Sequence, residues 1–402
     1  MSPASPAADP VVVVAARRTP MGGFQGSLSS LAAPQLGAAA VRAVVADARL
    51  EGAGIDEAIL GCVLPAGLGQ APARQAVLGA GLPSSVPCTT VNKVCGSGMK
   101  ALMLGMDQLL AGAARVVLAG GMESMSNAPY LLPKARGGLR LGHGQVLDHM
   151  FLDGLQSPFD GELMGVFAER CADAYGFTRE AQDAYAAESV RRARRAVREG
   201  GFGAEIVPVE VAGRGGAAAV AVAEDEAPMR CDVARIPSLK PAFRKDGTVT
   251  AANSSSISDG AAALVLMRRS EAGRRGLAPL ATLAGHATFA HAPEWFTTAP
   301  AGAVDRLLGQ LGWAARDVDL YEINEAFAVV TMAAMRDLGL AHEQVNANGG
   351  ACALGHPIGA SGARIVVTLL HALRRRGLRR GVASLCLGGG EATAVALECE
   401  GG

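Results

Sequence analysis

The sequence has few aromatic residues, no surplus of charge and no long apolar run. Only 4% of its 402 residues are Phe, Trp or Tyr, so its core must consist of small aliphatic side chains with close backbone packing at its 52 glycines. Its 37 Lys and Arg balance 37 Asp and Glu, which excludes a general attraction to nucleic acid or to an anionic membrane. No apolar run approaches the ~20 residues of a membrane-spanning helix. These absences favour an α/β protein of two or three domains.

The eight cysteines show no Cys-x-x-Cys pair and no repeating framework. The first ten residues have neither the basic nor the apolar segment of a secretory signal, and the final Glu-Cys-Glu-Gly-Gly is not a peroxisomal tripeptide. We therefore expect free thiols in a reducing cytoplasm. We expect neither a metal nor a bound cofactor.

Strand and helix patterns alternate through the first third of the chain and favour a mostly parallel sheet. After Ser124 this pattern stops, and residues 126–159 form a Gly-, Pro-, His- and Asp-rich excursion. A helix is expected over 178–200, its arginines forming a solvated face, and residues 213–222 are low-complexity strand or loop. The first third is expected to contain strands at 11–16, 59–64 and 115–119 and helices from Ser29 or Ser30 to about 47 and at 75–79.

The last third repeats features of the first. Val345-Asn346 echoes Val91-Asn92, and a Gly-Ser-Gly corner at 96–98 returns as Gly-Ala-Ser-Gly at 359–362. A helical pattern follows each corner. We interpret this as a duplicated βα core with the excursion inserted in its first half. The expected elements here are strands at 261–267, near Leu283 and at 320–323, and helices at 304–311 and 326–338.

Cys95 stands where a strand pattern changes abruptly to a helix pattern. Gly96 and Gly98 let the backbone turn sharply and leave the first helical N–H groups unobstructed. A thiol at the positive end of a helix dipole is expected to have a lowered pKa and to favour thiolate. The same glycines with Ala101 and Glu123 also satisfy a relaxed dinucleotide-binding pattern, although Glu123 comes late for that role.

Three further motifs stand beside Cys95: Asn-Glu-Ala-Phe at 324–327, Gly-His-Pro-Ile-Gly at 355–359 and Cys-Leu-Gly-Gly-Gly at 386–390. In a duplicated α/β core the carboxyl ends of strands converge, so we expect these motifs to meet. A cysteine activated by a histidine can accept an acyl group from a thioester. A second cysteine could move a proton at carbon, and glycine N–H groups could hold an oxyanion.

With these motifs, the chain resembles the thiolase family, the acetyl-CoA acetyltransferases, over nearly its whole length. The resemblance includes Gly-Gly-Met-Glu-Ser-Met-Ser at 120–126 and the run from Asn348 to Gly362. It implies a duplicated βαβαβαββ core, five-layered, with two sheets and their helices. It further implies a first core at 1–124 completed by 257–277, an inserted loop domain at 125–256 for coenzyme A and oligomer contacts, and a second core at 278–402.

The resemblance also implies roles and substrates. Cys95 is the acylated nucleophile, activated by His356, and Cys386 is the acid and base at the α-carbon. Asn324 holds a water that binds the enolate oxygen together with His356. The backbone N–H groups of Cys95 and Gly388 form a second oxyanion hole. Substrates are acetyl-CoA, acetoacetyl-CoA or longer 3-ketoacyl-CoA and CoA, and the enzyme is a homodimer or homotetramer.

The substrate pocket departs from the short-chain members of that family. Leu163-Met164 stands where they have His-Met, and Phe296 begins the stretch where they have Met-Gly-x-Gly-Pro. Ser255 matches the serine that contacts pantetheine, and Phe327 is the other expected substrate residue. We therefore expect an altered chain-length preference.

Two other functions stay open at this point. Decarboxylating condensing enzymes of the ketoacyl synthase or hydroxymethylglutaryl-CoA synthase type share the fold, but use Cys-His-His or Cys-His-Asn without a second cysteine. The other alternative is a catalytically silent interaction protein. Cys386 and the Asn324 motif argue against the first, and the filled reactive positions argue against the second.

Overall fold

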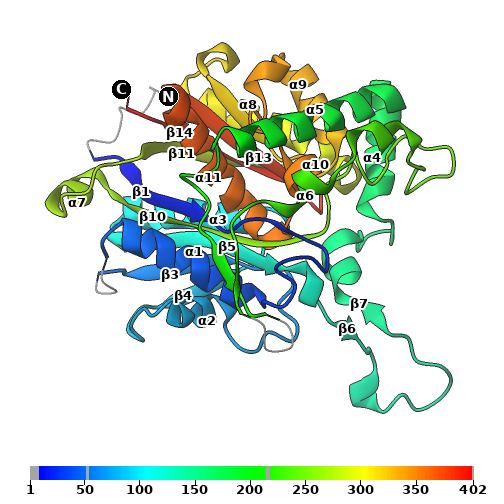
Figure 1. Ribbon diagram of the computed structural model, residues 1–402, viewed down its shortest axis with the longest axis horizontal. Coiled ribbons are helices and arrows are strands. Elements are labelled where there is room, and N and C mark those ends of the chain that lie inside the picture. The colour runs from blue at the N-terminus through cyan, green and yellow to red at the C-terminus, as the bar shows by residue number, and fades with distance from the viewer. Residues whose placement is uncertain (1–8, 51–53, 214–217, 401–402) are drawn as a thin grey trace.

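The duplicated order of strands and helices is present in the structure, a computed structural model that describes residues 9–50, 54–213 and 218–400 (Figure 1). Residues 1–8, 214–217 and 401–402, on which the expectations about the chain ends and the low-complexity segment partly rest, lie outside the described residues. The first half of the core consists of β1 Val11–Arg18, β2 Gly22–Gly23, α1 Ala33–Asp47, β3 Glu57–Gly61, α2 Pro72–Gly79, β4 Cys88–Val91, α3 Ser97–Ala111, β5 Val116–Ser124 and β10 Ser258–Arg268. The second half consists of α7 Arg269–Arg274, β11 Ala281–Ala290, α8 Ala299–Leu311, β12 Leu320–Ile323, α9 Ala328–Leu338, α10 Ala351–Leu354, α11 Ile358–Arg376, β13 Arg380–Leu387 and β14 Glu391–Glu398.

Both halves have the same strand order. It is β1-β10-β5-β3-β4 in the first half and β11-β14-β13-β12 in the second, where a bridge between Val345 and Tyr321 takes the place of β4. The halves join where β1 pairs with β11 at Val12 and Val13, so that hydrogen bonding runs through one ten-stranded sheet. The repeated order confirms the duplicated core.

The sheet is mixed, and the expectation of a mostly parallel sheet is wrong. β3 pairs in parallel with β4 and β5, and β12 with β13, but β1, β10, β11 and β14 pair antiparallel with their neighbours. β14 follows β13 after residues 388–390 alone, and so short a connection can only return antiparallel. The alternation of strands and helices does not reveal the antiparallel direction of the final strand of each half, although the strand expected at 261–267 lies within β10.

Alternate residues of each strand face different layers. Val11 and Val13 pack with α3 and α11 between the halves, whereas Val12 and Val14 pack with α1 and α2. On the other outer side, α8 and α9 cover β11, β13 and β14. The result is five layers, with α3 and α11 as the central one.

Helices α3 and α11 cross at glycines. A Cβ atom built on Gly98 would lie 2.8 Å from the backbone nitrogen of Ala363, and one on Gly362 would overlap the backbone nitrogen of Met99. Each helix therefore contacts the backbone of the other at its first turn. Because Cys95 precedes α3 and His356 precedes α11, this contact brings both residues to one place.

The inserted segment runs between β5 and β10 and contains a two-stranded arm that extends away from the core (Figure 1). No helix in the described ranges is long and apolar enough to cross a membrane. The segment consists of β6 Tyr130–Leu131, β7 Leu147–Asp148, α4 Met164–Tyr175, α5 Arg179–Arg198, β8 Val209–Val211, β9 Val220–Val222 and α6 Glu226–Arg230, with short turns η1 Met125–Asn127, η3 Phe151–Leu155 and η5 Val233–Ser238.

The arginine run of α5 is only partly a solvated face. Arg192 is 7% exposed and donates hydrogen bonds to the carbonyl oxygens of Val345 (2.7 Å) and His342 (3.0 Å). Arg194 donates to the carbonyl oxygen of Pro228 (2.9 Å). These two arginines tie α5 to the second half and to α6, which its charge pattern alone did not predict. The exposed members of the run are Arg191, Arg195 and Arg198.

The start of α1 also differs from the expectation. The helix begins at Ala33, and neither Ser29 nor Ser30 caps it. Instead, Gln35 Oε1 accepts the N–H of Ala32 at 2.8 Å. By contrast, α5 begins directly after Thr178, as expected, and the Thr178 hydroxyl accepts the N–H of Ala181 at 3.2 Å.

We expect Gly98→Ala to lower the melting temperature, because its methyl group would force α3 and α11 apart. Overpacking of this kind costs about 1–3 kcal/mol in unfolding free energy. Gly309→Ala is the matched control, since Gly309 lies in α8 with open space at its Cβ position. That substitution should be stabilising by about 0.5–1 kcal/mol. Equal shifts for both variants, measured by differential scanning calorimetry, would show that the crossing does not depend on Gly98.

Candidate active site

A cavity of about 370 Å³ lies at the first turns of α3 and α11. Cys95, His356 and Cys386 line it together with Gly388, so the structure brings together motifs that are far apart in the sequence. Asn324 contacts His356 but is not part of the lining. The predicted substrate residues that also line the cavity are Leu163, Met164, Ser255, Phe296 and Phe327.

Cys95 sits on a strained corner between β4 and α3. Val94, which the sequence suggested as part of the strand, has φ +46°, a left-handed conformation that costs a β-branched residue of order 1–3 kcal/mol. Three hydrogen bonds hold it. The N–H of Val94 donates to Asn92 Oδ1 (2.9 Å), Ser97 Oγ donates to the carbonyl of Val94 (2.6 Å), and the N–H of Lys93 donates to Ser97 Oγ (2.8 Å). These hydrogen bonds therefore fix the backbone directly before Cys95.

Cys95 does not have the lowered pKa that its position suggested. Burial raises the pKa of the Cys95 thiol to about 12, and the N–H groups of Gly388 and of Cys95 itself oppose only part of that shift. Loss of hydration thus outweighs the helix dipole. The free protein holds a neutral thiol, with two backbone donors already directed at the sulfur.

His356 is neutral and held in one tautomer. Burial lowers its pKa to about 3, and the charge of Arg364 lowers it further. His356 Nδ1 lies 2.6 Å from Ser361 Oγ, and that hydroxyl donates its own hydrogen to the carbonyl of Pro357 (2.9 Å). Ser361 must therefore accept a hydrogen from Nδ1. Nε2 keeps its lone pair and can take a proton from Cys95.

Ser361 is a candidate site residue that its sequence position alone did not indicate, because only the fold places its hydroxyl against His356. The Gly-Ala-Ser-Gly corner at 359–362, which marks the duplication, was the one sequence signal at this position. The serine stands five positions after His356, on the first turns of α11, and is fully buried.

Asn324 lies against the imidazole of His356. Its Nδ2 is 3.5 Å from both ring nitrogens, which is too long for a directed hydrogen bond to either. Its Oδ1 is buried and has no hydrogen-bond partner among the described residues. The N–H of Asn324 donates to the carbonyl of Ser384 (3.0 Å), which ties the residue to β13, the strand that carries Cys386.

Cys386 is the last but one residue of β13, lies beside Cys95 and is 1% exposed. Burial raises the pKa of its thiol well above the ordinary value, and the neighbouring Cys95 raises it further. The loop that follows reverses the chain at Gly389 and Gly390, which have φ +91° and +83°. This reversal leaves the N–H of Gly388 directed at Cys95.

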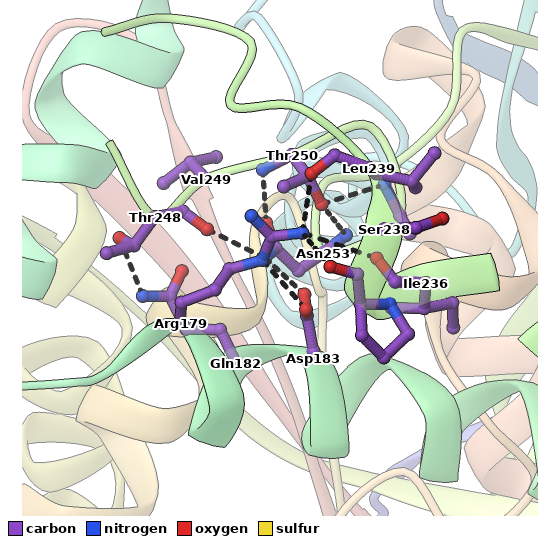
Figure 2. Close-up of polar contacts among 12 residues, drawn as sticks. Arg179, Gln182, Asp183, Ile236, Ser238, Leu239, Thr248, Val249, Thr250 and Asn253 are labelled. Carbon is purple, nitrogen blue, oxygen red and sulfur yellow. Dashed lines mark hydrogen bonds and ion pairs between the residues drawn. The ribbon is translucent and has the colours of Figure 1, made fainter. Parts of the chain in front are cut away.

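The serine segment at 254–256 reaches the cavity from the inserted segment. Figure 2 shows the buried network that holds it. Asn253 Nδ2 donates to Asp183 Oδ1 (3.0 Å), Asp183 Oδ2 accepts from Arg179 Nε (2.7 Å), and Arg179 Nη2 donates to the carbonyl of Leu239 (2.7 Å). Helix α5 and the chain near η5 therefore fix the wall in which Ser255 lies.

Aromatic rings form the inner part of the cavity. Phe296 is 2% exposed and packs edge-to-face against Phe167 and Phe327, with ring centroids 6.3 and 6.4 Å apart. Phe327 in turn packs against Phe243. Leu163 precedes the first residue of α4, Met164. This lining is apolar and suits an aliphatic acyl chain.

Two buried carboxylates organise the surrounding loops. Glu123 accepts the N–H groups of Val63 (2.9 Å) and Gly359 (2.9 Å), and burial raises its pKa to about 7. It therefore ties the loop after β3 to α11 and is not available to a ribose hydroxyl, which removes the dinucleotide alternative. Glu325 accepts Ser189 Oγ at 2.7 Å and joins α5 to the second half.

Two related halves that meet at a partly buried cysteine, Cys95, define a duplicated α/β enzyme with a cysteine at its centre. The thiolase N-terminal domain matches residues 11–270, and the thiolase C-terminal domain matches residues 277–399. The chain belongs to the thiolase family, as its motifs predicted.

Its relatives cover nearly the whole chain. It is 51% identical to acetyl-CoA acetyltransferase 2 of Arabidopsis thaliana over 96% of both chains. It is 49% identical to the acetyl-CoA acetyltransferase of Pseudomonas aeruginosa, over 96% of this chain and 98% of that one. The crystal structure of the Acat5 thiolase from Ascaris suum in complex with coenzyme A superposes with a TM-score of 0.92 at 44% identity, covering 97% of this chain and 100% of the other.

We expect Ser361→Ala to slow the alkylation of Cys95 by iodoacetamide, because His356 would lose the partner that keeps Nε2 unprotonated. Losing such a hydrogen bond should reduce the rate roughly 5-fold to 100-fold. Peptide mapping by mass spectrometry at pH 7 measures the rate.

Ser384→Ala provides the control for this test. Its hydroxyl donates to the carbonyl of Thr393 (2.9 Å) and is equally buried, but it does not contact His356. Its variant should alkylate at the wild-type rate. Equal slowing in both variants would mean that Ser361 acts only through the stability of the fold.

Proposed function

We propose that this cavity transfers acyl groups between coenzyme A thioesters in two half-reactions, the first at Cys95 and the second at Cys386. The chain is an acyl-CoA C-acyltransferase. It condenses two acetyl-CoA molecules, or acetyl-CoA and another acyl-CoA, to a 3-ketoacyl-CoA and CoA, and it catalyses the reverse thiolysis. The observation that carries the proposal is the second buried thiol, Cys386, beside Cys95 in a cavity that also holds a neutral histidine.

In the first half-reaction Cys95 takes the acyl group. His356 Nε2 accepts the proton of the Cys95 thiol as the sulfur attacks the thioester carbonyl. The carbonyl oxygen gains negative charge and is stabilised by the N–H groups of Cys95 and Gly388. When the C–S bond breaks, CoA leaves with the proton from His356. The acyl group remains on Cys95 as a thioester.

In the second half-reaction Cys386 acts at carbon. The Cys386 thiol gives its proton to His356, and the resulting thiolate removes a proton from the α-carbon of a second acetyl-CoA. The enolate oxygen is held by His356 and by a water on Asn324. The α-carbon attacks the acyl group on Cys95, the Cys95 C–S bond breaks, His356 returns its proton to the Cys95 sulfur, and the 3-ketoacyl-CoA leaves. A thiolate whose pKa is raised is a stronger base than an ordinary one, which suits abstraction from carbon.

The inserted segment, residues 125–256, is proposed to hold coenzyme A, with Ser255 against the pantetheine arm. Support comes from the position of the serine segment on the cavity wall and from the coenzyme A complex of the Ascaris relative. The core boundaries at 1–124, 257–277 and 278–402 belong to the same proposal.

We propose a homodimer or homotetramer in the cytoplasm. The arm at 130–148 exposes large apolar side chains far from the core, among them Leu141 (98% exposed), Tyr130 (68%) and Val146 (62%). β4 is an edge strand of the sheet. Exposed apolar side chains and an open edge are features that a second copy would cover.

We expect Cys386→Ala to separate the two half-reactions. The variant should still release about one CoA per active site as Cys95 is acetylated, because that step needs only Cys95, His356 and the two N–H groups. Turnover to acetoacetyl-CoA should fall by about 10²–10⁴, the range for a lost general acid or base. Intact mass after incubation with acetyl-CoA and a steady-state assay measure the two effects.

Two further variants calibrate this test. Cys95→Ala should abolish both the release of CoA and the turnover. Cys399→Ala, which removes a buried thiol outside the cavity, should change neither. A folded Cys386→Ala protein without an acetyl adduct would refute the assignment of Cys386 to the second step alone.

We expect Phe296→Met to raise the ratio of rates for longer over shorter 3-ketoacyl-CoA substrates. Met is flexible and can move aside where the Phe296 ring is held between two others, and a methylene in such a pocket changes rates by roughly 10-fold or more. Steady-state kinetics with acetoacetyl-CoA and 3-ketohexanoyl-CoA test this. Phe289→Met, outside the cavity lining, is the control. An unchanged ratio for Phe296→Met would mean that Phe296 does not set chain length.

A further inference from the structure

A second pocket lies where the last turns of α5 and α11 meet, at the opposite end of α11 from His356. It encloses about 290 Å³. With 19 residues, α11 separates the pocket from the active site by about 27 Å at 1.5 Å per residue. The pocket is lined by Arg195, Ala196, Glu199, Asn348, Arg375 and Arg376.

The lining carries an excess of positive charge. Three arginines face one glutamate, which leaves a formal charge of +2 in a protein whose total charge is zero. Arg375 Nη2 lies 3.5 Å from Glu199 Oε2, and both side chains are about half exposed (43% and 55%), so this pair is weak. Within the described part of the chain, the guanidinium of Arg195 forms no hydrogen bond or ion pair, although its backbone carbonyl accepts the N–H of Glu199 at 2.9 Å.

The pocket has a fixed polar base. Asn348 is 5% exposed and its Oδ1 accepts a hydrogen bond from Arg376 Nη2 at 3.3 Å. The same nitrogen donates to the carbonyl of Ala347 (3.4 Å). These two contacts hold the Nη2 edge of the Arg376 guanidinium in place. Its other N–H donors are not bonded to any described residue and remain free for a ligand.

The arginines also repel one another. Burial lowers the pKa of Arg376, and the charges of Arg195 and Arg375 lower it further. Like charges that line one pocket destabilise the folded protein unless an anion neutralises them. Guanidinium groups pair with oxyanions through two parallel hydrogen bonds, which a spherical halide cannot match.

We propose that this pocket binds a compact oxyanion with two negative charges, a phosphoryl group, between Arg195, Arg375 and Arg376. The site is separate from the acyl-transfer cavity and goes beyond the proposed function. Its pocket is open to solvent, so a phosphoryl group on a small metabolite fits as well as free phosphate. The two sources share one chemistry.

Isothermal titration of the full chain with inorganic phosphate, at constant ionic strength set with chloride, tests the site. The wild type should bind one phosphate per chain. Arg195→Gln and Arg376→Gln should each weaken binding roughly 10-fold to 100-fold, because each removes a charged donor. Asn348→Asp keeps the size of the base but adds a competing carboxylate, and it should weaken binding to a similar extent.

Arg198→Gln is the matched control. Arg198 is exposed on the same helix but does not line the pocket, and its loss changes the net charge by the same amount. Its affinity for phosphate should stay within about 2-fold of the wild type, since only screened long-range charge is lost. Equal weakening by Arg198→Gln and Arg376→Gln would replace the site with a diffuse basic surface, and an absence of saturable binding by the wild type would refute it.

Competition with coenzyme A and with glycerol 3-phosphate distinguishes the molecules that could supply the phosphoryl group. Saturating coenzyme A should leave phosphate binding unchanged, and glycerol 3-phosphate should displace phosphate if phosphorylated metabolites use the site. Displacement by coenzyme A would assign the pocket to the phosphates of the substrate and overturn a separate site. Neither result depends on acyl transfer by Cys95, so failure here leaves the proposed function standing.

Discussion

The structure depends on the close contact of α3 and α11. Gly98 and Gly362 allow each helix to touch the backbone of the other, where a single methyl group would separate them. Every other layer of the core is built outward from that central pair. The same contact places the first turns of both helices together, and with them Cys95 and His356. Duplication thus creates the site, because each half contributes one equivalent corner.

The titratable groups at the centre of the site are uncharged in the resting protein. Burial raises the pKa of Cys95 and lowers the pKa of His356, so the resting pair is a thiol and an imidazole rather than an ion pair. Two backbone N–H groups already face the sulfur. In the proposed acyl transfer, charge develops only as an acyl group arrives, in a place where fixed dipoles stabilise it without reorganisation. The hydrogen bond of Ser361 to His356 Nδ1 leaves Nε2 free to accept a proton in that step.

Buried polar contacts join the inserted segment to the core. Glu325 and Arg192 join α5 to the second half, and the Asn253 network holds the serine segment against the cavity. Removing any one partner would leave a buried polar group unpaired, at a cost of about 1–3 kcal/mol.

The sequence by itself determined the duplication, the family and the residues that meet at the site, because glycine corners and strand-helix periods are local signals. Cys95, His356 and Cys386 could be named for this reason. Tertiary structure alone decided the antiparallel direction of β10 and β14, the neutral state of the Cys95 thiol and the contact between Ser361 and His356. Strand direction depends on neighbours distant in sequence, and a pKa depends on how much water the fold removes. Burial is a property of the whole packed molecule, and no local pattern encodes it.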